Sequence, residues 1–243
     1  MVRRLTLTLA VTPTLPRALT LSLTPPRYAA AASGPKDVVL VIDTSGSMAG
    51  DLNDMAKQAA KMVIDTLTEV DYVTIVRYST GASAYPNDRY YNPWDYNPSP
   101  SRLEQATDAT KDELKEWIDD NIDASGTTNF RNAFELAWEV VDRSYAYDSY
   151  AWSSSNCNRI MLFLSDGEPN KWDDSDTAWV KEKAASYDPP MHLLTYGLGE
   201  GAKADVLKDI ACGGKGVYYS VTKDSISDTM ASYYQVWIAR LDG

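Results

Sequence analysis

The fold of this chain is decided by the stretch VVLVIDTSGS, at residues 38–47. Its first residues are apolar and mostly β-branched, which predicts a buried strand. Alternate residues of an extended segment point to the same side, so Asp43, Ser45 and Ser47 can present three oxygen atoms together where the strand ends. Hard divalent cations prefer such ligands. The same residue types are also frequent in ordinary turns, which is the competing interpretation of this stretch taken alone.

Two later segments favour the metal-site interpretation. The sequence SGTTN at residues 125–129 precedes a segment of helical period, and LSDGE at residues 164–168 follows the apolar run 160–164. Each segment places an oxygen ligand at the end of an element. In their order, the three segments resemble the metal-ion-dependent adhesion site of von Willebrand factor type A domains, whose pattern is D-x-S-x-S, then Thr, then Asp.

This resemblance implies a set of metal ligands. The hydroxyl ligands would be Ser45, Ser47 and Thr128, and the carboxylates of Asp43 and Asp166 would bind directly or through water. Thr127 is the competing threonine, but the G-x-T-[ND] pattern of the family puts the ligand directly before Asn129. Only two formal negative charges would then face a Ca²⁺ or Mg²⁺ ion. The ion would stay electrophilic and short of one ligand, so an acidic side chain of a protein ligand could complete its coordination.

From Lys36 onward, apolar runs of strand length alternate with segments of helical period, which is typical of parallel crossover units. The predicted parallel strands are 37–42, 71–79, 159–164, 191–198 and 216–220, and helical periods cover 52–63, 114–118, 133–141, 206–211 and 226–237. We therefore expect an α/β fold with a Rossmann-like, doubly wound, mostly parallel central sheet flanked by helices. Such sheets bind ligands at the carboxyl ends of their strands, where Asp43 and Asp166 lie and where the alternation of the chain also places Thr128.

The first 35 residues differ from the rest of the chain. They contain no acidic residue, alternate Leu with Thr, carry Arg3 and Arg4 near the start and end in small residues, which indicates a signal peptide. Pro13 and Pro16 interrupt the apolar stretch, so an organellar transit peptide or an incorrect translation start is an alternative. We divide the chain into this targeting or disordered segment, 1–35, and a type A domain, 36–243.

Composition excludes several classes of function. A net charge of -11 and a pI of about 4.6 argue against nucleic acid and anionic membranes as partners. No apolar run reaches the roughly 18 residues of a membrane span. His192 is the only histidine and lies inside a predicted strand, so no Ser-His-Asp or Cys-His arrangement can be assembled. The glycines at 197–201 lack the G-x-G-x-x-G spacing of dinucleotide sites. The sequence predicts a binding domain and not an enzyme.

The two cysteines have a predictable position. Cys157 precedes a predicted strand and Cys212 follows a predicted helix, which places both at the sheet edge opposite the metal site. Their shared edge and the suspected export signal predict a disulfide between them. The tyrosine-rich segments 84–101 and 145–158 should meet at the same edge, where they form either a second contact surface or packing for each other beneath the sheet.

Stretches outside the metal motif are similar to the type A domain of voltage-gated calcium channel alpha-2/delta subunits, namely residues 109–139, 156–162, 204–215 and 230–238. This resemblance implies a divalent-cation-dependent protein-binding domain, extracellular or at the cell surface, from a fragment of a channel auxiliary subunit or a free-standing secreted domain. It also implies that one cysteine could instead pair with a partner polypeptide. The leading alternative is an intracellular type A module of a metal-chelatase-like ATPase assembly. A third interpretation is a hydrolase in which the metal activates water and Glu168 is the base.

Overall fold

The computed structural model describes residues 34–86, 101–145, 153–167 and 169–231. These residues contain a seven-stranded sheet in which six strands follow the order β3-β2-β1-β5-β6-β7 and β4 pairs with β2. The strands are β1 (Lys36–Asp43), β2 (Tyr72–Tyr78), β3 (Ala82–Ala84), β4 (Glu104–Gln105), β5 (Asn158–Ser165), β6 (Met191–Leu198) and β7 (Tyr218–Val221). All neighbours pair in parallel except β3 and β4, which run antiparallel to β2. The predicted doubly wound sheet is confirmed.

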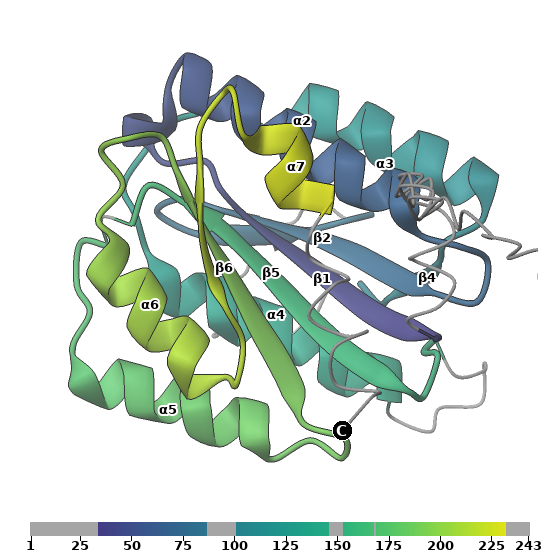
Figure 1. Ribbon diagram of the computed structural model, residues 1–243. Coiled ribbons are helices and arrows are strands. Elements are labelled where there is room, and N and C mark those ends of the chain that lie inside the picture. Colours follow the sequence, from purple (N-terminus) through teal and green to yellow (C-terminus); the bar gives the residue numbers. More distant parts are fainter. Residues whose placement is uncertain (1–33, 87–100, 146–152, 168, 232–243) are drawn as a thin grey trace, which may run out of the picture.

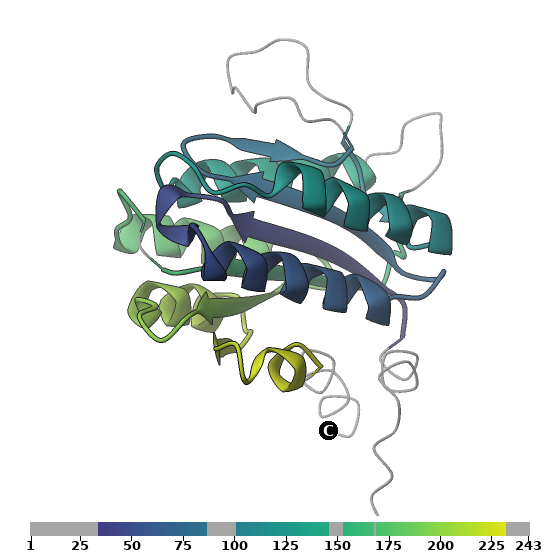
Figure 2. The same ribbon diagram turned by 90° about the horizontal axis from the view of Figure 1, so that it is seen from above.

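Helices cover both faces of the sheet (Figures 1 and 2). One face carries α2 (Asp51–Thr66), α3 (Asp108–Asn121) and α7 (Ile226–Ala231), and the other carries α4 (Phe130–Tyr145), α5 (Asp174–Ala185) and α6 (Ala204–Gly213). A short 3-10 helix, η1 (Gly46–Met48), links β1 to α2. Among these described helices, none has the length and apolar character needed to cross a membrane.

The central strand β1 divides the hydrophobic core into two layers. Leu40 and Ile42 pack into the cluster beneath α2, α3 and α7, whereas Val39 and Val41 pack into the cluster beneath α4 and α6. This split follows from the period of a strand, in which successive side chains point to opposite faces. Because both faces of β1 are covered, its sequence is continuously apolar and does not alternate with polar residues.

Among the described elements, helix α5 is the long one that the hydrophobic period does not reveal. Its buried residues are Val180 and Ala184, too few to produce a recognisable apolar stripe. The start of the helix is instead fixed by a capping box. The Asp173 carboxylate accepts hydrogen bonds from the backbone N–H groups of Ser175 (2.8 Å) and Asp176 (3.3 Å), and the Asp176 carboxylate accepts one from the Asp173 N–H (3.2 Å).

Several sequence predictions fall outside the described residues. The suspected targeting segment is one, because residues 1–33 are not described. The central parts of the tyrosine-rich segments, residues 87–100 and 146–152, and the continuation of α7 beyond residue 231 are others. The described flanks of the second segment do lie at the predicted edge. Tyr145 and Ser154 donate side-chain hydrogen bonds to the carboxylate of Asp37 near the start of β1, and the Ser155 N–H does so as well.

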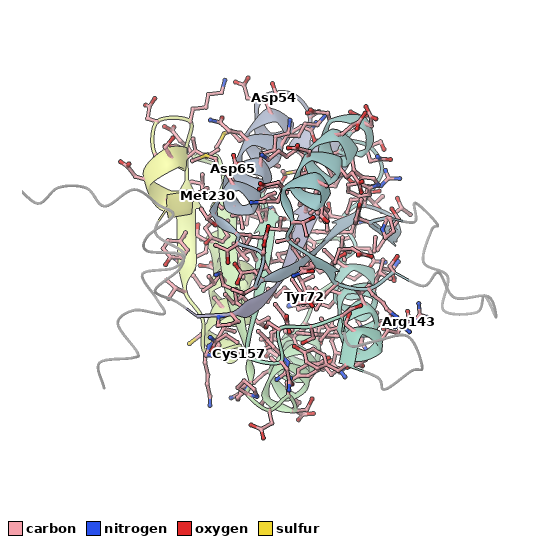
Figure 3. The ribbon with its side chains drawn as sticks, turned by 90° about the vertical axis from the view of Figure 1, so that its right-hand side faces the viewer. Asp54, Asp65, Tyr72, Arg143, Cys157 and Met230 are labelled. Atoms are coloured by element: carbon pink, nitrogen blue, oxygen red, sulfur yellow. The ribbon has the colours of Figure 1, made fainter. Side chains whose placement is uncertain are left out.

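The structure does not confirm the predicted disulfide, since Cys157 and Cys212 are both free cysteines in it. Cys157 directly precedes β5 at the amino-terminal edge of the sheet (Figure 3), and Cys212 lies in the last turn of α6. α6 packs against β6 and β7, the strands beyond β5. The two cysteines therefore lie at the same edge of the sheet, as expected. Cys157 is next to β5, however, whereas Cys212 belongs to a helix that packs on β6 and β7. A disulfide requires the two Cα atoms to lie roughly 4.4–6.8 Å apart, and a position at the same sheet edge does not ensure this.

A buried ion pair joins the beginnings of β1 and β2. The Lys36 ammonium lies 3.1 Å from the Asp71 carboxylate, and the two side chains are 1% and 0% exposed. Asp71 also accepts hydrogen bonds from the Lys36 N–H (3.1 Å), the Thr68 N–H (2.8 Å) and the Thr68 hydroxyl (3.0 Å). The carboxylate is thus fully engaged, and it connects the turn before β2 to the central strand.

Replacing Asp71 with Ala should lower the free energy of unfolding by about 3–5 kcal/mol, because the Lys36 ammonium would stay buried without its counter-ion. Asp65→Ala is the control. Asp65 pairs with Lys115 on the surface, and its side chain is 62% exposed, so its loss should cost about 1 kcal/mol or less. Urea unfolding followed by circular dichroism measures both variants. Equal losses would contradict the importance assigned to the buried pair.

Candidate metal centre

The candidate ligands lie at the carboxyl-terminal edge of the sheet, from which α2 and α6 begin, toward the left in Figure 1. β1 and β5 are neighbours, and Ile42 pairs in register with Leu164. The residues that end the two strands, Asp43 and Ser165, are therefore adjacent. The loop 125–129 reaches the same edge because it immediately precedes α4. The fold thus brings together the three segments that the sequence singled out.

Asp43 is held firmly in place. It is the last residue of β1 and is 0% exposed. One carboxylate oxygen accepts a hydrogen bond from the Ser45 N–H at 2.8 Å, and the other accepts one from the Ser165 hydroxyl at 2.6 Å. The Ser165 hydroxyl in turn accepts a hydrogen bond from the Gly167 N–H at 2.9 Å. Both carboxylate oxygens are therefore oriented by neighbours.

Ser45 and Ser47 present their hydroxyls side by side, with 3.1 Å between the two Oγ atoms. Ser45 is 1% exposed, whereas Ser47 lies in η1 and is exposed. Met48, which is fully buried, anchors the end of η1 in the core. The D-x-S-x-S stretch therefore runs from the end of β1 into η1, and its two serine oxygens converge at the sheet edge.

The loop 125–129 is fastened to the neighbouring strand ends by its backbone. The Ser125 N–H donates to the Thr44 carbonyl at 2.7 Å, the Gly46 N–H donates to the Gly126 carbonyl at 3.0 Å, and the Asn129 N–H donates to the Ser79 carbonyl at 3.0 Å. Gly126 has a φ of +81°, and a Cβ atom there would lie 2.7 Å from the Thr80 hydroxyl. Glycine is therefore required at this position.

The structure distinguishes between the two adjacent threonines of this loop. Thr127 is exposed, and its hydroxyl hydrogen-bonds the Thr80 hydroxyl at 3.1 Å. Thr128 is 5% exposed, and within the described part of the chain its hydroxyl has no hydrogen-bond partner. The Thr128 hydroxyl is also not one of the fully buried polar atoms that lack a partner, so it is open to water or to a ligand. This contrast agrees with the choice of Thr128 as the candidate ligand.

Asp166 completes the set from the loop after β5. It is 8% exposed, and its carbonyl accepts a hydrogen bond from the Lys203 N–H at 2.8 Å. The next residue, Gly167, has a φ of +82°, and a Cβ atom there would come within 2.3 Å of the Lys203 carbonyl oxygen. The glycine after Asp166 is therefore needed because two backbone segments approach each other closely at this point.

The electrostatics of the edge favour a cation. Burial raises the pKa of Asp43, and the charge of nearby Asp166 raises it further, while hydrogen bonds from Ser165 and Ser45 lower it. Burial and the Asp43 charge also raise the pKa of Tyr78 well above its ordinary value, so this phenol stays neutral beside the carboxylate. A desolvated carboxylate with a second one nearby would gain from a positive ion between them.

The donor set is unusual for a metal site, because it relies on hydroxyls. Among the described residues, no cluster of three or more His, Cys, Asp or Glu side chains could hold a metal. Two carboxylates and three hydroxyl oxygens suit a hard, oxygen-preferring cation better than a thiol- or imidazole-preferring one. Sequence reasoning overlooked Ser165, although it lies in the quoted LSDGE segment. Its role becomes visible only through the contact with Asp43 from the neighbouring strand.

Comparison with known proteins defines the class. The profile of the von Willebrand factor type A domain matches residues 37–231, which is most of the chain. The chain belongs to the von Willebrand factor type A domain family.

Particular relatives refine this assignment. The chain is 27% identical over 197 residues to the Homo sapiens voltage-dependent calcium channel subunit alpha-2/delta-2, and 29% identical over 211 residues to the Homo sapiens subunit alpha-2/delta-3. These matches cover 81% and 86% of this chain but 15% and 18% of those subunits. The chain therefore spans less than a fifth of the length of the subunits it matches. It is also 23% identical over 191 residues to inter-alpha-trypsin inhibitor heavy chain H3 of Mesocricetus auratus, covering 79% of this chain and 20% of that protein.

Solved structures agree on the fold. The von Willebrand factor type A protein from Catenulispora acidiphila superposes with a TM-score of 0.65 at 20% identity, covering 84% of this chain and 42% of that chain. Proximal thread matrix protein 1 from the mussel byssus, solved with zinc in its adhesion-site motif, superposes with a TM-score of 0.57 at 17% identity and covers 84% and 46% of the two chains. At these identities the likeness concerns the fold alone.

Removing the Ser165 hydroxyl should weaken divalent-cation binding. Ser165→Ala leaves one oxygen of the Asp43 carboxylate without its 2.6 Å hydrogen bond, so we expect about tenfold lower affinity for Mg²⁺ in calorimetry. Ser144→Ala is the control, because Ser144 is about as buried as Ser165 but is not near the candidate ligands. Its hydroxyl donates to the Val140 carbonyl within α4 and accepts from the Leu103 N–H. Its Mg²⁺ affinity should match the wild type. An unchanged affinity in Ser165→Ala would show that this hydroxyl does not orient a ligand.

Proposed function

We propose that the chain is a divalent-cation-dependent protein-binding domain. The observation that carries this proposal is the convergence of the five candidate residues on one edge, where the Thr128 side chain is nearly buried but its hydroxyl has no hydrogen-bond partner in the described residues. Ser45, Ser47 and Thr128 are the proposed hydroxyl ligands, and Asp43 and Asp166 the proposed carboxylates, bound directly or through water. Ca²⁺ and Mg²⁺ both suit these oxygen ligands.

The charge balance of the site indicates the chemistry of the partner. Two carboxylates balance the charge of a divalent ion formally, but the neutral hydroxyls transfer little further charge to it. A hard cation with these ligands still accepts another anionic oxygen, and an acidic side chain of a partner protein supplies one. The chain as a whole has a net charge of -11, so general electrostatic attraction would not bring such a partner. Recognition would then depend on the ion itself.

A binding role agrees with the surroundings of the site better than a catalytic one. His192 is the second residue of β6 and pairs with Ile160, so it lies toward the amino-terminal end of the strand, away from the candidate ligands. A hydrolase would need a base close to the metal, and His192 is too far along β6 to serve as one. Glu168, the other residue considered for that role, lies outside the described residues. We propose that the chain is not an enzyme.

The parent protein and its location are a further part of the proposal. The alpha-2/delta subunits among the relatives are calcium channel subunits, so we propose an extracellular or cell-surface domain of an alpha-2/delta-like auxiliary subunit. The signal-like residues 1–35 support that location. The second candidate is an intracellular type A module of a chelatase-like ATPase assembly, in which Cys157 and Cys212 would stay reduced, as they are in the structure. Protease protection of the tagged full chain in intact cells distinguishes the two.

The two threonines of the loop provide a matched test of the ligand assignment. Thr128→Ala removes a proposed ligand and should lower Mg²⁺ and Ca²⁺ affinity at least tenfold. Thr127→Ala makes the same chemical change one residue away, on a hydroxyl bonded to Thr80, and should lower affinity less than twofold. Calorimetry on both variants measures this, and the unfolding transition checks that each is folded. The reverse order of effects would assign the ligand to Thr127.

Partner binding should disappear when the cation is removed. We expect proteins captured from an extracellular fraction by the immobilised domain to be released by EDTA and rebound when Mg²⁺ or Ca²⁺ is restored. The Thr128→Ala domain should capture less of the same proteins, and Thr127→Ala should behave like the wild type. Partners that remain bound in EDTA would place recognition elsewhere on the molecule.

A further inference from the structure

A polar hollow of about 460 Å³ lies directly beside the candidate metal centre. Its size is within the range of about 300–1,000 Å³ that is common for ligand sites. Thr128 belongs both to the hollow and to the proposed metal ligands, so the two are contiguous. The other lining residues come from the loop after β2, the start of α4, the segment after β5 and the first turn of α5, and they are Thr80, Thr127, Asn129, Arg131, Asn132, Asn170, Lys171 and Asp176.

The walls of the hollow are held together by hydrogen bonds between these segments. The Thr127 N–H and hydroxyl both donate to the Thr80 hydroxyl, at 3.0 and 3.1 Å, and the Asn132 side-chain amide donates to the Thr80 carbonyl at 3.1 Å. The segment after β5 is attached as well, because the Asn170 N–H donates to the Thr128 carbonyl at 2.9 Å. The hollow is therefore preformed, and a ligand entering it need not order these segments.

Among the described residues that line this hollow, one cation is available to a ligand. Arg131 is already engaged, because its guanidinium bonds to Glu135 at 2.8 Å and to Asp176 at 3.0 Å and lies 3.8 Å over the ring of Trp179. Lys171 is exposed and has no ion pair with any of the described residues. Its ammonium is therefore the charge that a ligand in the hollow would meet.

The start of α4 adds to this positive potential. α4 has 16 residues and begins at Phe130, and the Asn129 side chain caps it by accepting a hydrogen bond from the Asn132 N–H at 3.1 Å. The positive end of the helix dipole thus faces the hollow, where it favours an anionic group. Against a net charge of -11 for the whole chain, the hollow is a local exception.

We propose that this hollow is a second subsite, which takes an acidic side chain adjacent in sequence to the residue that binds the metal. The inference rests on the proposed cation-dependent function and specifies its partner, which would carry two neighbouring acidic residues. One carboxylate completes the coordination of the ion, and the other lies against Lys171 and the start of α4. Lys171 is then a specificity-determining residue that contacts the partner without binding the metal.

The test uses two short blocked peptides that differ in one charge. Both contain Gly-Asp-X-Gly, with X either Glu or Gln, and they are titrated into the Mn²⁺-loaded full chain in 0.15 M salt. Water proton relaxation reports the loss of metal-bound water when a carboxylate reaches the ion. We expect the Asp-Glu peptide to bind about fivefold more tightly than the Asp-Gln peptide. Of this fivefold preference, a factor of two would arise merely because the Asp-Glu peptide has two carboxylates that can reach the ion. The remaining factor is about what one exposed ion pair contributes to affinity.

Two charge-reversal variants complete the experiment. Lys171→Glu should reduce the preference to twofold or less while leaving the Asp-Gln peptide bound to the ion. Lys181→Glu makes the same change on the exposed surface of α5, outside the hollow, and should keep the full preference. A wild-type preference of twofold or less, or a preference that survives Lys171→Glu, overturns the subsite. If the Asp-Gln peptide also fails to displace water in the wild type, the proposed function itself fails, and the subsite with it.

Discussion

The candidate site depends on one buried carboxylate, that of Asp43, at the end of the central strand. Covering β1 on both faces fixes its register against β2 and β5, and this register places Asp43 next to Ser165. Desolvation raises the pKa of Asp43 and makes the isolated charge unfavourable. Two hydrogen bonds to the carboxylate offset part of that cost. A cation would offset more, so the stability of the edge and its proposed binding function rest on the same group.

The loops around the candidate site are attached to each other by backbone hydrogen bonds, which leaves the side-chain hydroxyls available to a ligand. Backbone hydrogen bonds from Ser125 to Thr44 and from Gly46 to Gly126 join the segment after β1 to the loop 125–129. The Ser45, Ser47 and Thr128 hydroxyls are therefore not needed to maintain the loops and can face a ligand. The same backbone attachment shapes the adjacent hollow, so metal coordination and the proposed choice of partner residue share one rigid frame.

The sequence alone predicted the sheet, its strand ends and the gathering of the candidate ligands, because continuous apolar runs and D-x-S-x-S, G-T-T-N and S-D-G segments are local signals. It missed what depends on contacts between distant segments. The role of Ser165 comes from a neighbouring strand, and α5 is defined by a capping box with little apolar stripe. Lys171 and Thr128 come to line the same hollow only through folding. The structure does not confirm the predicted disulfide, because a common sheet edge does not fix the distance between two thiols.

The most direct measurement is anomalous X-ray diffraction from a crystal of this chain grown with Mn²⁺. We predict one strong anomalous peak at the carboxyl-terminal edge, about 2.0–2.6 Å from the hydroxyl oxygens of Ser45, Ser47 and Thr128, with the carboxylates of Asp43 and Asp166 as direct or water-mediated ligands. A peak at another place, or no peak at the edge at a Mn²⁺ concentration that saturates binding in solution, would contradict the assignment of this site.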